Sequence, residues 1–188
     1  MRWTRLDIPG TDACELVSRP DGWRVEGVAE FGSGVAAARL EYVAEANRDW
    51  ETLRAEVRGT AGARSIEFTV ERSGAGAWRI NGADQPAFRG LIDLDLGFTP
   101  ATNIFPLRRL ALDPGKAAAA EAVWLDDTAW AFRRLPQRYE RRSADAYWYE
   151  SPTAGYADLL VVGPDGFVRE YPGLWTAVDH PAARILER

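Results

Sequence analysis

The sequence predicts a mainly β protein, in which a long antiparallel sheet curls into a roll or open barrel with one short helix. Two observations predict this fold class. Apolar and polar residues alternate with a period of two along most of the chain, and Gly, Pro, Asn or Asp interrupts the alternation roughly every eight to twelve residues. Helical periodicity is nearly absent. This pattern is typical of a meander of antiparallel strands.

The strands of the first half follow one another with short turns. The turn Pro20-Asp21-Gly22 precedes a strand over 23–31, whose odd-numbered apolar residues share one face. Asn81-Gly82 suits the positive φ values of a tight hairpin, so a turn is expected there. The same alternation predicts strands over 35–44, 50–58, 65–71 and 77–80.

One stretch predicts the helix. Thr99 offers an N-cap hydroxyl and Pro100 suits the first helical position. Pro106 should keep this helix brief or bend it before 107–112. The Ala run 117–120 lies between Pro114-Gly115 and an alternating segment, and we interpret it as strand.

The second half again predicts short strands, with a turn at Pro164-Asp165-Gly166. These strands are expected over 120–125, 129–134, 139–142, 147–150, 159–162 and 167–171. No linker or boundary interrupts the pattern, so we expect a single domain over 1–188.

Composition limits the function classes. The formal net charge of −5 argues against a general nucleic-acid binder, which needs a concentrated cationic face. No run approaches the ~20 apolar residues of a membrane-spanning helix. The first residues lack the apolar core of a signal peptide, so we expect a cytoplasmic protein. The single cysteine, Cys14, excludes an intrachain disulfide and a cysteine-built zinc site, and an inert thiol is expected.

Acidic and basic residues around position 100 are the first candidate site. Asp93 and Asp95 lie two apart, so on a strand both carboxylates project from one face while Leu94 and Leu96 project from the other. They could act as acid and base or bind a cation, or they could simply form an exposed face or pair with nearby arginines; we favour one of the last two. If Arg108 and Arg109 lie on a strand, they point to opposite sides, so at most one of them shares a face with a given ligand. That arginine could bind a phosphate or carboxylate group of the ligand, or it could form a buried ion pair with Asp93 or Asp95.

Known catalytic motifs are missing. His180, the only histidine, follows Asp179 and precedes Pro181, and we expect no catalytic role for it. Gly32-Ser33-Gly34 is a loop, not a nucleophile elbow. We therefore predict no catalytic residues, no metal site and no cofactor.

Aromatic residues crowd the second half. They could form an ordinary core, or line a ligand cavity if the sheet encloses more apolar space than its own side chains fill. They include Trp124, Trp130, Phe132, Tyr139, Tyr147, Trp148, Tyr149, Tyr156 and Trp175.

The stretch 90–110, GLIDLDLGFTPATNIFPLRRL, closely resembles the bacterial glycolipid-binding family, once catalogued as a domain of unknown function. The resemblance extends to 3–10, 42–50, 137–139 and 171–175. It implies a spiral β-roll around a single helix, similar in architecture to the LolA and LolB lipoprotein carriers. Leu91 departs from the cysteine expected in many relatives, which weakens any thiol mechanism. The glycolipid label comes from architecture, and fold alone does not determine function.

Three functional hypotheses follow. The first is a protein that binds a glycolipid or another amphiphile in an apolar concave interior. Polar residues would orient the head group of the ligand or brace the helix; they are Asp93, Asp95, Asn103, Arg108 and Arg109. Further candidate ligand contacts are Trp124, Tyr139 and Tyr147. The second is a hydrolase or isomerase using Asp93 or Asp95 with Arg108 or Arg109. The third is a structural or interaction domain without a small ligand. We favour the first, and the sequence indicates no oligomeric state.

Overall fold

The computed structural model describes residues 1–178. Within them, 14 strands form one large sheet in the order β10-β13-β14-β15-β16-β17-β1-β2-β3-β4-β5-β6-β7-β8, and β12-β11-β9 form a second. The first-half strands are β1 (Arg2–Arg5), β2 (Gly10–Arg19), β3 (Gly22–Phe31), β4 (Ala38–Asn47), β5 (Thr52–Ala61), β6 (Arg64–Arg72), β7 (Trp78–Ile80), β8 (Ala83–Asp84) and β9 (Asp93–Leu96). The others are β10 (Ala117–Ala119), β11 (Ala122–Asp126), β12 (Ala131–Leu135), β13 (Arg138–Arg141), β14 (Ala146–Ser151), β15 (Tyr156–Val162), β16 (Val168–Tyr171) and β17 (Trp175–Ala177).

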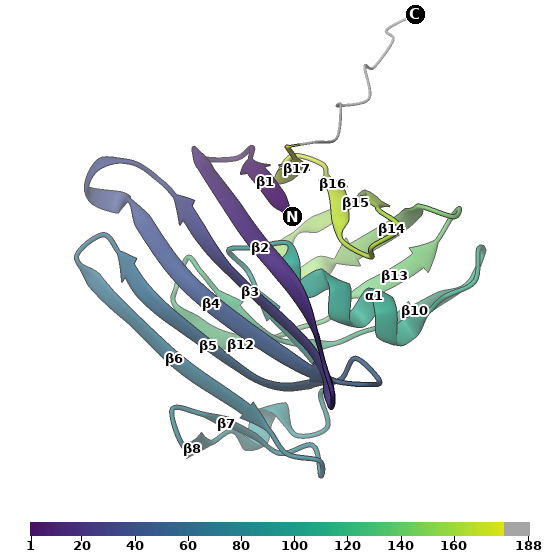
Figure 1. Ribbon diagram of the computed structural model, residues 1–188, viewed down its shortest axis with the longest axis horizontal. Helices are drawn as coiled ribbons and strands as arrows, with labels where there is room; N and C mark the ends of the chain where they lie inside the picture. The colour runs from purple at the N-terminus through teal and green to yellow at the C-terminus, as the bar shows by residue number, and fades with distance from the viewer. Residues whose placement is uncertain (179–188) are drawn as a thin grey trace, which may run out of the picture.

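The large sheet is an open roll, as predicted. Neighbouring strands of this sheet run antiparallel, and its two end strands, β8 and β10, are not paired with each other. Pairing of β1 with β17 joins the first-half strands to the second-half strands. Figure 1 shows α1 (Ile104–Leu110) between strands β2–β6, coloured purple to blue, and strands β13–β16, coloured green to yellow. The mainly β fold with one short α-helix is confirmed.

Several predicted strand starts were wrong. The strands predicted over 120–125 and 129–134 begin at Ala122 and Ala131, and the strand predicted over 159–162 begins earlier, at Tyr156. The strand predicted over 35–44 begins at Ala38, because Gly34–Ala36 form a 3₁₀ turn. Trp50 lies outside β5, in the hairpin after β4, with φ of 65°. The Asn47 side-chain oxygen accepts hydrogen bonds from the backbone N–H groups of Asp49 and Glu51, which stabilises that turn. Asn81-Gly82 forms the predicted hairpin, with φ of 48° and 77°.

The helix extends further than predicted. Ala101–Asn103 form a 3₁₀ turn that leads into α1. The Thr99 hydroxyl accepts a hydrogen bond from the Ala101 N–H at 3.0 Å, but the N-cap positions are Pro100 for this turn and Asn103 for α1, so Thr99 is not the N-cap that the sequence predicted. Pro106 falls in the first turn of α1, where its missing N–H costs no intrahelical hydrogen bond. Residues up to Leu110 therefore remain helical.

The concave face of the sheet is apolar but covered by the protein itself. One buried cluster packs β2–β6 against β9, β11 and the start of α1, with Leu40, Val57, Leu94, Phe105 and Leu125 among its members. A second cluster packs β13–β16 against Leu107 of α1. Helix α1 and the three-stranded sheet thus lie against the concave face and contact its apolar side chains.

Candidate functional site

Asp93 and Arg109 form an ion pair beside the helix. Strand β9 turns Asp93 and Asp95 to one face, as predicted, while Leu94 and Leu96 lie in the apolar cluster on the other. Arg109 donates from Nε to Asp93 Oδ1 at 3.1 Å and from Nη2 to Oδ2 at 2.5 Å. Burial raises the Asp93 pKa, while the hydrogen bond and charge of Arg109 oppose that rise.

The two arginines lie on a helix, so the prediction of opposite strand faces was wrong. Successive helical residues point about 100° apart, because the helix has 3.6 residues per turn. Arg109 turns inward to Asp93, while Arg108 is exposed at the other side. Only one of the two therefore reaches the carboxylates of β9.

Asp95 takes part in a separate hydrogen-bonded group. Gln137 donates from Nε2 to Asp95 Oδ2 at 2.6 Å and to the Tyr149 hydroxyl at 2.9 Å. Burial raises the Asp95 pKa to about 6. Sequence reasoning assigned no role to Gln137, because its partners are 42 and 12 positions away and no local pattern connects them.

Asn103 and Tyr139 complete the contacts around the helix. Asn103, just before α1, donates from Nδ2 to the Tyr139 hydroxyl at 3.0 Å, and the Tyr139 ring lies 4.9 Å from that of Tyr149. Trp124 lies opposite Asp95 in the β9–β11 register. Several of the candidate residues therefore lie close together around the helix, but their polar groups are mainly hydrogen-bonded to other side chains of the protein.

A second buried hydrogen-bonded cluster, formed by Asp12, Tyr42 and Thr99, was not identified from the sequence. Thr99 and Tyr42 both donate hydrogen bonds to the buried carboxylate of Asp12, the latter at 2.9 and 3.0 Å. Burial raises the Asp12 pKa to about 6, against those hydrogen bonds. Strands β2 and β4 are thereby tied to the segment that leads into α1. The sequence separations of 30 and 87 residues left no signal to find it.

Arg108 and Tyr147 lie away from these groups. Both line a cleft of about 270 Å³ at the C-terminal end of α1, together with Arg141. The structure therefore divides the eight candidate residues between an interior set and this surface cleft.

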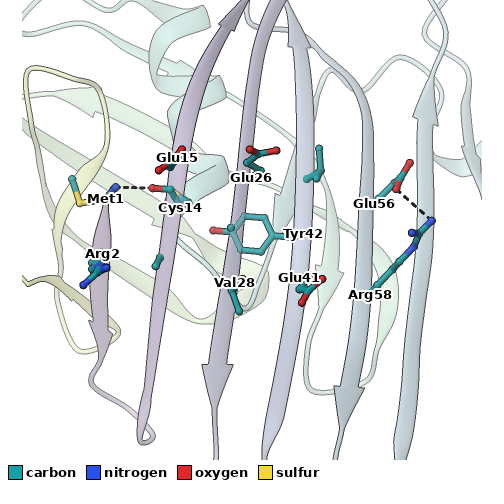
Figure 2. Close-up of a pocket in the computed structure, with 13 residues that line it drawn as sticks. Met1, Arg2, Cys14, Glu15, Glu26, Val28, Glu41, Tyr42, Glu56 and Arg58 are labelled. Atoms are coloured by element: carbon teal, nitrogen blue, oxygen red, sulfur yellow. Dashed lines mark hydrogen bonds and ion pairs between the residues drawn. The ribbon is translucent and has the colours of Figure 1, made fainter.

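A larger cleft, of about 590 Å³, opens on the outer face of β1–β5 (Figure 2). Strand register places Glu15 opposite Glu26, and Glu26 opposite Val43. The next row places Ala13 opposite Val28 and Val28 opposite Glu41. Carboxylates thus surround an aliphatic floor made by Ala13, Val28 and Val43.

Three charges of the outer-face cleft, those of Glu15, Arg2 and the N-terminal ammonium of Met1, have no ion-pair partner within residues 1–178. Glu26 pairs with Arg24 at 2.8 Å, and Figure 2 shows the contact of Glu56 with Arg58, at 3.5 Å. Within residues 1–178, no salt bridge or side-chain hydrogen bond involves Glu15 or Arg2. The Met1 ammonium donates a hydrogen bond to the Cys14 carbonyl at 2.6 Å, whereas the Glu15 and Arg2 side chains are a free acceptor and a free donor beside the aliphatic floor.

Cys14 and His180 add no further site. Burial raises the Cys14 pKa to about 12, so the thiol stays protonated at neutral pH, consistent with the predicted inert role. His180 lies outside the described residues. No group of three His, Cys, Asp or Glu side chains suited to a metal occurs in the described part of the chain, and none of its helices is long and apolar enough to cross a membrane.

Comparison with known proteins identifies the family. The family described as "Putative glycolipid-binding" matches residues 1–177. The chain belongs to this family. The crystal structure of a DUF1089 family protein from Pseudomonas aeruginosa is similar, with 27% identity, a TM-score of 0.78, and coverage of 89% of this chain and 92% of that chain. No curated protein matches.

Membership of the glycolipid-binding family confirms the resemblance drawn from 90–110. That stretch forms β9, the 3₁₀ turn and α1, and thus contains the Asp93–Arg109 pair. The residues that carry the resemblance therefore lie mostly in the interior of the roll. The outer-face cleft is built from β1–β5 instead.

Proposed function

We propose that this protein binds an amphiphile of the glycolipid class in the outer-face cleft of β1–β5. The observation that carries the proposal is the combination of an aliphatic floor with the unpaired Glu15 and Arg2. The family description supports the same ligand class. Since protein side chains cover the concave face, the ligand site of the original hypothesis moves to the outside of the sheet.

The chemistry of a sugar suits this arrangement. Each sugar hydroxyl both donates and accepts hydrogen bonds, so Glu15 can accept from one and Arg2 can donate to another. Val28 and Val43 can contact the C–H face of the ring or a methylene chain, where each buried CH₂ contributes about 0.8 kcal/mol. Hydrogen bonds to Glu15 and Arg2 would then orient the sugar, and contact with the aliphatic floor would increase the affinity for the ligand.

The interior residues have a different role in this proposal. Asp93, Arg109, Asn103 and Tyr139 brace α1 against the two sheets, and they do not touch the ligand. Their hydrogen bonds to one another support this role. The hydrolase or isomerase alternative needs a free carboxylate in an open cleft, whereas Asp93 and Asp95 already bind Arg109 and Gln137. No observation favours that alternative.

The test begins with native mass spectrometry of protein purified from its own host, followed by extraction and analysis of bound lipid. Titration with n-octyl β-D-glucoside, followed by ligand-observed NMR, then locates the site. Val28→Glu should weaken binding at least about tenfold, because it places a charge on the apolar floor. Val35→Glu is the matched control, since Val35 is 97% exposed and outside the cleft.

Equal binding by the parent protein and Val28→Glu would remove the outer-face cleft from consideration. Thermal unfolding followed by circular dichroism should show both variants folded. Glu15→Gln and Arg2→Gln test the polar contacts separately, because each keeps a polar side chain while removing one charge. Both should weaken glucoside binding severalfold.

A further inference from the structure

The cleft at the C-terminal end of α1 collects positive charge. Its walls come from α1, from the end of β13, from β14 and from the turn that follows β15. Arg108 and Arg141 both line it, and none of its described lining residues is acidic. Two positive charges thus face one cleft of about 270 Å³ in a chain whose formal net charge is −5.

Arg108 has unused hydrogen-bond donors. Its Nη2 donates to the Pro164 carbonyl at 3.2 Å, while Nε and Nη1 have no partner within residues 1–178. The guanidinium lies against Gly166, where a Cβ would collide with Nε. Gly166 also has a φ of 92°, so glycine suits this position both for its backbone and for the approach of Arg108.

Arg141 is held rigidly without being neutralised. It donates hydrogen bonds to three backbone carbonyls, those of Leu112 at 2.8 Å, Ser143 at 3.0 Å and Ala144 at 2.7 Å. No carboxylate of the described chain pairs with it. Carbonyl groups orient a guanidinium but leave its full charge, and the remaining N–H groups can bind a further acceptor.

Tyr147 supplies a third donor. The residue is only 7% exposed, yet its hydroxyl makes no hydrogen bond to any described residue. The fully buried side-chain atoms without a partner in this part of the chain are Gln137 Oε1 and Ser151 Oγ, so the Tyr147 hydroxyl is not sealed in the core. Because Tyr147 lines the cleft, that hydroxyl is available to a molecule inside it.

Neighbouring groups do not cancel this charge. Asp165, in the turn beside the cleft, pairs with Arg169 at 2.6 Å, and Asp145 accepts a hydrogen bond from Ser143 at 2.7 Å. The carbonyl end of α1 adds a partial negative charge of at most about half a unit, smaller than the two guanidinium charges. The cleft is therefore suited to an anion.

We propose that the cleft formed by Arg108, Arg141 and Tyr147 binds phosphate or a phosphate ester. Two guanidinium groups and a hydroxyl match the several acceptor oxygens of that anion, and arginine binds phosphate through paired N–H donors. This site goes beyond the proposed function, because it shares no lining residue with the outer-face cleft. The phosphate can belong to a soluble molecule or to a lipid headgroup.

Isothermal titration calorimetry of the full chain with inorganic phosphate, at low salt, tests the site. We expect saturable binding by the parent protein, at least about tenfold weaker binding by Arg108→Gln, and severalfold weaker binding by Tyr147→Phe. Arg64→Gln is the charge-matched control, because Arg64 is exposed and lies outside this cleft. Thermal unfolding should show that Tyr147→Phe, which removes a single oxygen atom, remains folded.

A second measurement distinguishes the source of the phosphate. Co-sedimentation compares phosphatidylcholine vesicles with and without phosphatidate. Binding to the phosphatidate vesicles that Arg108→Gln abolishes would assign a lipid headgroup, whereas binding of inorganic phosphate without vesicle binding would assign a soluble ligand. The proposal would be overturned if the parent protein bound neither inorganic phosphate nor phosphatidate vesicles. It would also be overturned if the parent protein and the variants Arg108→Gln and Tyr147→Phe bound equally well.

Discussion

Two adjacent arginines have different environments in this protein. Arg109 is directed to a carboxylate that is 1% exposed, whereas Arg108 remains exposed against a backbone carbonyl and at 5.9 Å from the Trp50 ring. A buried carboxylate is costly unless it is paired, so the partner of Asp93 should matter greatly to stability. Sequence reasoning named this pairing as one alternative and could not say which arginine would form it.

Arg109→Ala should therefore lower the free energy of unfolding by roughly 3 kcal/mol, because it leaves Asp93 charged and unpaired in the interior. Urea denaturation at pH 7 measures the loss. Arg39→Ala is the control: its pairs with Glu30 and Glu41 are exposed and should contribute at most about 1 kcal/mol. Similar losses in the two variants would contradict the interior role of Arg109.

Helix α1 is short, and its ends determine much of its stability. The Thr99 hydroxyl accepts a hydrogen bond from Ala101 in the 3₁₀ turn that precedes α1, and Pro106 occupies a position where no N–H is needed. Its end is less favourable, because Ala111 adopts the left-handed conformation with φ of 43° and ψ of 42°. Glycine accepts this conformation at little cost, whereas an L-residue pays about 1 kcal/mol or more.

Ala111→Gly should stabilise the protein by about 0.5–1 kcal/mol, since it relieves the left-handed strain at the helix end. Differential scanning calorimetry should show the midpoint rising by roughly 1–4 °C for a chain of this size. Ala119→Gly, in extended β10, should instead be neutral or destabilising. A lower midpoint for Ala111→Gly would show that the strain is absent.

The whole molecule depends on contacts between the large sheet and the layer inside it. Asp12, Tyr42 and Thr99 form one such contact. Within the large sheet, Trp3 of β1 donates from Nε1 to the Val168 carbonyl of β16 at 2.7 Å, across 165 residues. These separations explain why local patterns do not predict the contacts. The Asp12 pKa, raised from 3.8 to about 6, makes the first contact sensitive to pH.

Asp12→Asn should remove part of this pH dependence. Between about pH 4 and 6 the folded protein holds the Asp12 proton more tightly than the unfolded chain, so Asp12 lowers stability as pH rises through that range. The free energy of unfolding of Asp12→Asn, relative to the parent, should therefore increase from pH 4 to pH 7. The increase should be on the order of 2 to 3 kcal/mol at most.

Chemical denaturation at several pH values measures this difference. Asp95→Asn should behave in the same direction, because burial also raises the Asp95 pKa to about 6. Asp21→Asn, at an exposed turn, is the control. A constant difference between Asp12→Asn and the parent across this range would contradict the raised pKa of Asp12.

Local sequence determined the strands, the Asn81-Gly82 hairpin, the short helix and the shared face of Asp93 and Asp95. It could do so because alternation, turn residues and caps act over a few neighbouring positions. The stretch 90–110 also indicated the family, which the match over residues 1–177 confirms.

Tertiary structure decided what fills the roll and which polar groups remain free. Whether the concave face is covered depends on packing between distant segments, such as β9 beside β11 and α1 against β13–β16. Likewise, only the folded chain shows that Asp93 meets Arg109 while Arg108, Arg141 and Tyr147 share a cleft. Burial and pairing are set by long-range contacts, and a single sequence carries no local pattern for them.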